Sequence, residues 1–218
     1  MYSLYTTMLI NLKKSETELR EQINKSLRTE VRKAEKSGLE IKDNPSTDEI
    51  QQAYQLYLKM MKKKHIPVEK SYYLGNSDKT KLIVALFQGK VVSYIQFFLE
   101  SPTDLLKKTK ICALETIAND DEYKHLCGNS FLYWRGILYM QSLGFEYLNF
   151  NGVDYEGGGD FSSLAHFKRK WNGIEITCVS KKNLFSYIYW KYFRKYAFIQ
   201  KCVYFLLVSL FSQRYLKY

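Results

Sequence analysis

The chain has 218 residues, enough for one sizeable domain, and its apolar fraction of 46% is ordinary for a globular protein. Its four cysteines form no CxxC pair and, with the three histidines, show no metal-ligand spacing, so neither a metal site nor a disulfide framework is expected. The amino-terminal run lacks the ordered regions of a signal peptide, which predicts a cytoplasmic protein.

The positive charge is concentrated at the carboxyl end. Residues 180–218 carry eight of the 33 lysines and arginines and no acid, whereas residues 1–179 are nearly neutral at +3. A basic tail of this kind predicts an anionic partner, such as lipid headgroups or nucleic acid.

Local signals, taken in chain order, predict a mixed α/β fold. Ser15 and Glu18 form a capping box that opens a long helix, and a second capping box begins at Ser46. The turn Gln88-Gly89 joins two apolar runs in a β-hairpin. The predicted order is strand 6–12, helix 15–37, extended segment 39–42, a helix from about 46, strands 81–87, 90–99 and 110–117, helix 130–143, strand 145–151, helix 162–171 and strand 174–179. Antiparallel pairs followed by αβ units indicate a mixed sheet with helices on its faces.

A glycine-rich turn, residues 157–159, follows the strand at 145–151. It is not a P-loop, since no Gly-Lys-Ser/Thr follows, and Ser162 replaces the third glycine of the dinucleotide fingerprint. Asp154 and Asp160 flank the turn. Either can orient an amine or accept its proton, although aspartates that stabilise a turn are commoner.

The next helix carries Phe167-Lys168-Arg169-Lys170-Trp171. Its two aromatic residues are four apart and share a helix face, which we expect to pack inward. Of the three cations, Lys168 follows the glycine turn most closely and can reach the carboxyl edge of the sheet. A solvated face is the default for the other two.

A small-residue loop, Cys127-Gly128-Asn129, enters the helix predicted from Ser130. Such a loop exposes backbone N–H groups that can hold a phosphate or an acyl carbonyl. The alternative is an ordinary helix cap with a turn.

These segments, in this order and spacing, resemble the GNAT superfamily of N-acyltransferases, and more closely its Fem-type branch, the peptidoglycan bridge aminoacyltransferases. The run His125-Leu126-Cys127-Gly128-Asn129-Ser130 is similar to the acyl-donor loop Gln/Arg-x-x-Gly-x-Gly/Ala. The run AHFKRKWNG is similar to the Fem-type Tyr-Arg-Phe-Lys-x-x-Phe-Gly-Gly, with Lys168 in the lysine place. The resemblance covers most of residues 7–180.

The resemblance implies a GNAT-like acyl-CoA N-acyltransferase fold for residues 38–182, with a leading strand and helix at 1–37 and a basic, aromatic helical tail at 183–218. It implies a transferase that moves an aminoacyl or acetyl group onto an amine by direct attack in a ternary complex. The implied acceptor is a peptidoglycan or polysaccharide precursor of the cell envelope, and the implied process is cell wall organisation.

The resemblance also implies roles for particular residues. The expected catalytic residues are Lys168, Asp154 as the base and Glu115 as an alternate base. The expected donor-binding residues are His125, Gly128, Asn129 and Ser130, and the expected substrate contacts are Tyr155, Gly157, Gly158, Arg28 and Arg32. No resident cofactor or metal is expected, and the acyl donor is either aminoacyl-tRNA or acyl-CoA.

Two features of the sequence lead to expected partners: its resemblance to one of the two Fem-type domains, and its basic tail. Fem-type enzymes have two GNAT-like domains, and a partner subunit in place of the first one is expected. The tail at 183–218 predicts contact with tRNA or with the anionic inner surface of the membrane. The apolar run 202–211 of this tail is too short to span a bilayer. The alternative is a catalytically incomplete GNAT-like half that acts as a membrane-surface or partner-binding subunit.

Overall fold

The computed structural model of the protein describes residues 2–64, 66, 68, 72–100, 109–153 and 160–181. The tail at 183–218 and the glycine turn lie outside the described residues. The described elements are β1 (Tyr2–Asn11), α1 (Glu16–Gln22), α2 (Lys25–Glu35), β2 (Glu40–Lys42), α3 (Thr47–Lys63), β3 (Thr80–Phe87), β4 (Lys90–Phe98), β5 (Ile111–Asn119), the 3₁₀ helix η1 (Asp121–Leu126), α4 (Gly128–Ser142), β6 (Tyr147–Gly152), α5 (Asp160–Arg169) and β7 (Ile174–Lys181).

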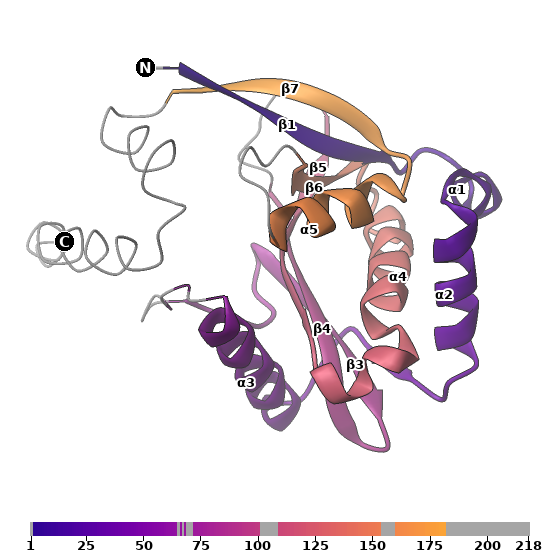
Figure 1. Ribbon diagram of the computed structural model, residues 1–218, viewed down its shortest axis with the longest axis vertical. Helices are drawn as coiled ribbons and strands as arrows, with labels where there is room; N and C mark the ends of the chain where they lie inside the picture. The colour runs from indigo at the N-terminus through magenta and orange to yellow at the C-terminus, as the bar shows by residue number, and fades with distance from the viewer. Residues whose placement is uncertain are drawn as a thin grey trace, which may run out of the picture.

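Seven strands form one sheet in the order β2-β3-β4-β5-β6-β1-β7. β5 and β6 pair in parallel, whereas the other neighbouring strands are antiparallel. The amino-terminal strand β1 lies between β6 and β7, so both ends of the described chain meet in the sheet (Figure 1). The predicted mixed sheet is confirmed.

Helices cover both faces of this sheet. α1, α2 and α4 lie on one face and α3 on the other, as Figure 1 shows. The larger core cluster joins α1, α2 and α4 to the sheet, and the smaller one joins α3 to β3 and β4. Among the described residues, no helix is both long enough and apolar enough to cross a membrane.

The predicted single helix at 15–37 is wrong, because two helices occupy this stretch. Ile23 leaves α1 in an extended conformation, with ψ of 149°, and its side chain is buried. Asn24 then caps α2 by accepting from the Ser26 amide, and its own amide donates to the carbonyl of Lys170 at 2.8 Å. A local cap and a contact 146 residues away therefore override the helical pattern.

Two predicted helix starts also differ from the structure. α4 begins at Gly128, because Cys127 adopts a left-handed conformation with φ of 58° and turns the chain directly from η1 into the helix. α5 begins at Asp160, so Ser162 and Ser163 lie inside the helix and not at the N-cap position predicted for them. An acid in the first turn favours this earlier start, since it complements the helix dipole.

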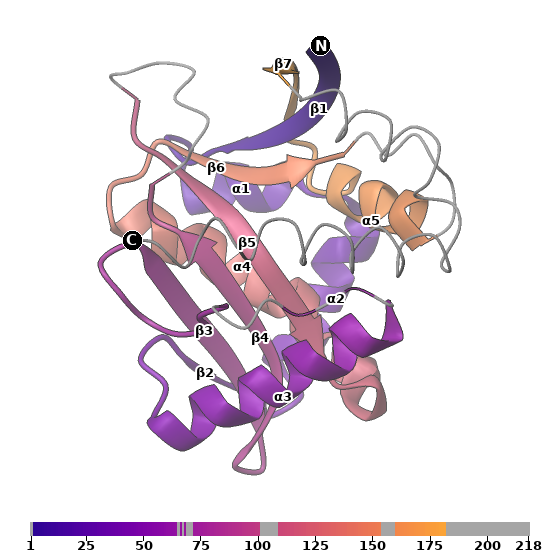
Figure 2. The ribbon, with the colours of Figure 1, turned by 90° about the vertical axis from the view of Figure 1, so that its left-hand side faces the viewer.

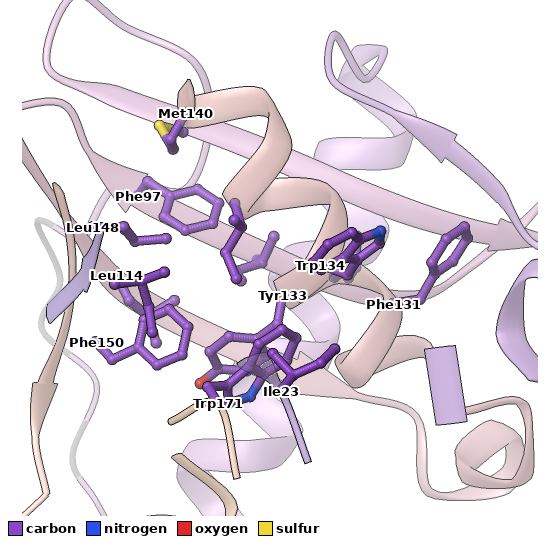
Figure 3. Packing of buried hydrophobic residues seen from close by; sticks show 14 of the residues in the cluster. Ile23, Phe97, Leu114, Phe131, Tyr133, Trp134, Met140, Leu148, Phe150 and Trp171 are labelled. Atoms are coloured by element: carbon purple, nitrogen blue, oxygen red, sulfur yellow. The ribbon is translucent and has the colours of Figure 1, made fainter. Parts of the chain in front are cut away.

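The aromatic residues around α5 pack inward, as predicted. Trp171 is buried, and its ring lies 5.8 Å from that of Phe150 and 6.3 Å from that of Phe167. Tyr133 from α4 joins them, with its ring 5.4 Å from that of Trp171 (Figure 3). This cluster fixes α5 against β6 and α4, and so sets the position of Lys168.

Candidate functional site

The two parallel strands of the sheet separate at their carboxyl ends. β5 and β6 pair only from Ile111–Ala113 to Tyr147–Asn149, and beyond this point they diverge (Figure 2). The side-chain amide of Asn151 then reaches across and donates to the carbonyl oxygen of Leu114. Diverging strands leave the edge of β5 open within the sheet, at the carboxyl end where ligands of α/β proteins bind.

A cavity of about 810 Å³ lies where the strands diverge. Residues of β5, α3 and α5 line it, together with residues of η1, α4 and β6. Its volume is within the range of small-molecule sites. The polar and charged lining residues include Lys59, Lys63, Lys64, Glu115, Thr116, Asn119, Asp120, Asp121, Lys124, Asn129, Asn151 and Lys168.

Lys168 is a buried cation on the cavity wall. Its side chain is only 3% exposed, and its Nζ donates to the carbonyl oxygen of Gly152 at 3.0 Å. Burial lowers the pKa of Lys168 to about 8, and the nearby ammonium of Lys64 acts in the same direction. At neutral pH this lysine is still mostly protonated, so it can stabilise negative charge that develops in the cavity.

Glu115 is the extra residue of a β-bulge. Gln96 pairs with Thr116 and Phe97 pairs with Leu114, which leaves Glu115 unpaired on β5. Bulges of this kind re-aim a side chain beside active sites. Glu115 lines the cavity and accepts from the side-chain amide of Gln96 at 2.7 Å. Burial raises the pKa of its carboxyl group, and this hydrogen bond opposes the shift.

The start of α4 borders the cavity through Asn129. Asn129 and the carbonyl of Ala118 both lie within hydrogen-bond distance of the Ser93 hydroxyl, at 2.8 and 2.9 Å. The Ser130 hydroxyl donates instead to Glu30 of α2 at 2.5 Å. The side chain of Cys127 forms no capping hydrogen bond to α4. Backbone amides in the first turn of a helix suit an anionic group.

Lysines at the end of α3 give the cavity rim a positive charge. Lys63 pairs with Asp121 at 2.8 Å, and Lys124 pairs with the same carboxylate at 2.7 Å. Lys90 pairs with Asp120 at 3.2 Å. Both aspartates of the cavity are thereby neutralised, while Lys59 and Lys64 add further positive charge.

The structure brings together only some of the predicted site residues. Lys168, Glu115 and Asn129 line one cavity, and Gly128 and Ser130 flank Asn129 in the chain. Asp154, Tyr155, Gly157 and Gly158 lie outside the described residues, so their predicted roles stay predictions.

Three other predicted residues do not line the cavity. His125 is exposed on η1, with its Nδ1 3.2 Å from the carbonyl oxygen of Glu122. Arg28 and Arg32 lie on α2, and the guanidinium of Arg28 donates to the carbonyl of Glu21 at 3.1 Å. Their roles as donor and substrate contacts also stay predictions.

Gln96 and Asn151 are site residues that the sequence analysis missed. Gln96, like Ser93, is a polar residue inside the apolar run VVSYIQFF, and both are buried. A buried polar side chain needs hydrogen-bond partners, which is the signal that marks Gln96. Asn151 has a φ of 61°, which asparagine tolerates better than most residues, but the sequence does not show what its side chain contacts.

Comparison with known proteins rests on solved structures, because no family model and no curated protein matches the sequence. FemX superposes with a TM-score of 0.63 at 13% identity, over 81% of this chain and 60% of FemX. The fold is GNAT-like, of the Fem type.

Two further solved structures have a similar fold. The C-terminal domain of a putative lysylphosphatidylglycerol synthetase from Agrobacterium fabrum has a TM-score of 0.56 at 15% identity, over 85% of this chain and 62% of that one. L-PGS from Bacillus licheniformis has a TM-score of 0.55 at 13% identity, over 82% of this chain and 61% of L-PGS. The chain thus spans about three-fifths of the length of these relatives, and at this identity the likeness concerns the fold.

Proposed function

We propose that this GNAT-like protein is an N-acyltransferase that moves an aminoacyl or acetyl group from an activated donor onto an amine. The observation that carries the proposal is the buried Lys168, anchored to Gly152 in a cavity that opens between the diverging strands β5 and β6. The proposed acceptor is an amine on a peptidoglycan or polysaccharide precursor of the cell envelope.

The proposed chemistry needs orientation and charge stabilisation, with no covalent enzyme intermediate. The acceptor amine attacks the donor carbonyl, the bond to the donor's sulfur or oxygen breaks, and a proton leaves the attacking nitrogen. The ammonium of Lys168 stabilises the negative charge that develops on the carbonyl oxygen, in a site where burial strengthens the interaction. Asp154 is the proposed base, and Glu115 on the cavity wall is the alternate.

The donor side of the proposal rests on the start of α4 and on the lysines of the rim. The amides at Gly128–Ser130, which the Cys127 side chain does not cap, and the lysines Lys59 and Lys64 suit a donor that carries phosphate groups. Both acyl-CoA and aminoacyl-tRNA carry them, so the rim does not choose between the two.

A donor screen tests this proposal. Thermal unfolding is followed with acetyl-CoA, with alanyl-tRNA and with uncharged tRNA as the control, and saturating donor should stabilise the protein by about 2–4 kcal/mol. Transfer to a primary amine is then measured for the wild type and for Lys168→Ala. Unchanged turnover in a folded Lys168→Ala protein would overturn the role of Lys168.

The same screen separates the second candidate, a catalytically incomplete half that binds a partner or a membrane surface. That protein would show no stabilisation by any donor and no transfer. Binding to anionic vesicles through the basic tail would then be measured by co-sedimentation at low and high salt.

A further inference from the structure

Glu115 is held in one orientation by a buried amide. Gln96 has no exposed surface, and its Oε1 accepts from the amide of Gly75 at 2.7 Å. Its Nε2 donates to the carbonyl of Tyr73 at 3.0 Å and to Oε2 of Glu115 at 2.7 Å. Both hydrogens and the oxygen of the Gln96 amide are therefore engaged, and the Glu115 carboxylate is fixed relative to β4 and to the segment that precedes β3.

The charge of Glu115 is not balanced by a cation in the described part of the chain. The two other acids of the cavity, Asp120 and Asp121, each form an ion pair with lysine. No described lysine, arginine or histidine pairs with Glu115, whose neighbours are the neutral groups of Gln96 and Tyr72. Burial and the Glu115 carboxylate both raise the pKa of the nearby Tyr72 hydroxyl, so this neighbour stays neutral.

A half-buried carboxylate without a cation is costly unless something completes it. Burial removes water from the carboxylate, and neutral hydrogen bonds recover only part of that loss. The carboxylate lies on the wall of a cavity large enough for a substrate. A cationic group carried by the substrate would complete the charge balance.

We infer that Glu115, oriented by Gln96, is an ammonium-binding subsite of this cavity. It binds a primary ammonium group of a substrate, and so it selects substrates that carry one. The inference rests on the proposed function, because it places this group on a reactant of acyl transfer. The ammonium comes either from an aminoacyl donor or from the acceptor amine before it loses its proton, and the two sources share one chemistry.

Paired ligands that differ only in this charge test the subsite. The donor pair is 3′-alanylamino-3′-deoxyadenosine, a stable analogue of an aminoacyl-adenosine end, and its N-acetylated form. The acceptor pair is Nα-acetyl-lysine methylamide and its Nε-acetylated form. Dissociation constants are measured by ligand-observed NMR for the wild type, Glu115→Gln and the control Glu122→Gln, an exposed glutamate outside the cavity.

The expected result is a charge preference that depends on Glu115. In the wild type and in Glu122→Gln, one charged ligand should bind about 10- to 100-fold more tightly than its acetylated form. In Glu115→Gln this ratio should fall to about one, while the affinity of the acetylated form is unchanged. If the donor pair shows this charge preference, the ammonium group comes from the aminoacyl donor. If the acceptor pair shows it, the ammonium group is the acceptor amine.

Other outcomes overturn the inference. Equal binding of charged and acetylated ligands in the wild type would do so, as would a charge preference that survives in Glu115→Gln and in Glu115→Ala. Thermal unfolding checks that each variant is folded. Acetyl-CoA binding with no Glu115-dependent charge preference would remove only the subsite, whereas failure of every donor in the screen would remove the proposed function as well.

Discussion

The Nζ of Lys168 donates to the carbonyl oxygen of Gly152 at 3.0 Å, so a cation from α5 is anchored at the last residue of β6. The side-chain amide of the preceding residue, Asn151, donates to the carbonyl oxygen of Leu114 on β5. Two adjacent residues of β6 therefore join the two sides of the cavity. The position of the cation and the opening between the strands depend on one short segment.

Lys168 should make the free energy of unfolding increase as the pH rises. Its proton leaves near pH 8 in the folded state, whereas the ordinary lysine pKa is 10.5, so between these values the unfolded chain binds more protons. The free energy of unfolding then rises with pH. Relative to Lys168→Met, the wild type should gain about 2–3 kcal/mol between pH values of about 7 and 10.5, measured by urea unfolding. A constant difference across this range would contradict the lowered pKa.

The same pKa should limit activity at alkaline pH. If the charged form of Lys168 stabilises the developing oxyanion, kcat/KM should fall above a pH of about 8. Arginine stays protonated over the whole range, so in Lys168→Arg any remaining activity should lack this fall. The measurement is a pH profile of transfer for both proteins. The same alkaline limb in both profiles would show that another group titrates.

Asn151 should control how the two strands separate. Asn151→Gly keeps a residue that tolerates the φ of 61° but removes the amide that donates to Leu114. We expect a loss of about 1–2 kcal/mol in the free energy of unfolding and weaker donor binding. The matched control is Asn172→Gly, since Asn172 also has a positive φ, of 49°, but does not line the cavity. Equal effects of both variants on donor binding would argue against a specific role of Asn151.

Gly136 should be required where α4 packs on β4. A Cβ placed at Gly136 would overlap the Phe97 ring and would lie 2.9 Å from its Cε2. Gly136→Ala should therefore lower the free energy of unfolding by about 1–3 kcal/mol, despite the better helix propensity of alanine. Phe97→Leu makes room, so the double variant should be more stable than the two single losses predict. Additive losses in denaturant unfolding would show that the overlap is not the cause.

Sequence signals predicted correctly the caps and turns that depend only on residues close by in the sequence. The capping boxes at Ser15 and Ser46 are formed, and the Gln88-Gly89 turn has the two positive φ values, 52° and 79°, that a tight hairpin needs. The break between α1 and α2 was not predicted, because part of its cause is the bond from Asn24 to Lys170, far away in the sequence.

The candidate site was predicted only in part. Lys168 stood out because a cation follows a glycine turn beside inward-facing aromatic residues, and the structure does place it in a cavity. Gln96 and Asn151 were missed, since their importance lies in what they contact. The bulge that aims Glu115 is a register shift between two strands, and no pattern within β5 alone reveals it.

The sequence by itself determined the mixed α/β class, most of the elements and the inward-facing aromatic residues, because caps, turns and apolar periodicity act over a few residues. The tertiary structure decided that β1 enters the sheet between β6 and β7, that β5 and β6 separate after three paired residues, and that Lys168 and Glu115 line one cavity. These features depend on strand pairing and side-chain packing between segments far apart in the chain, which no local pattern records.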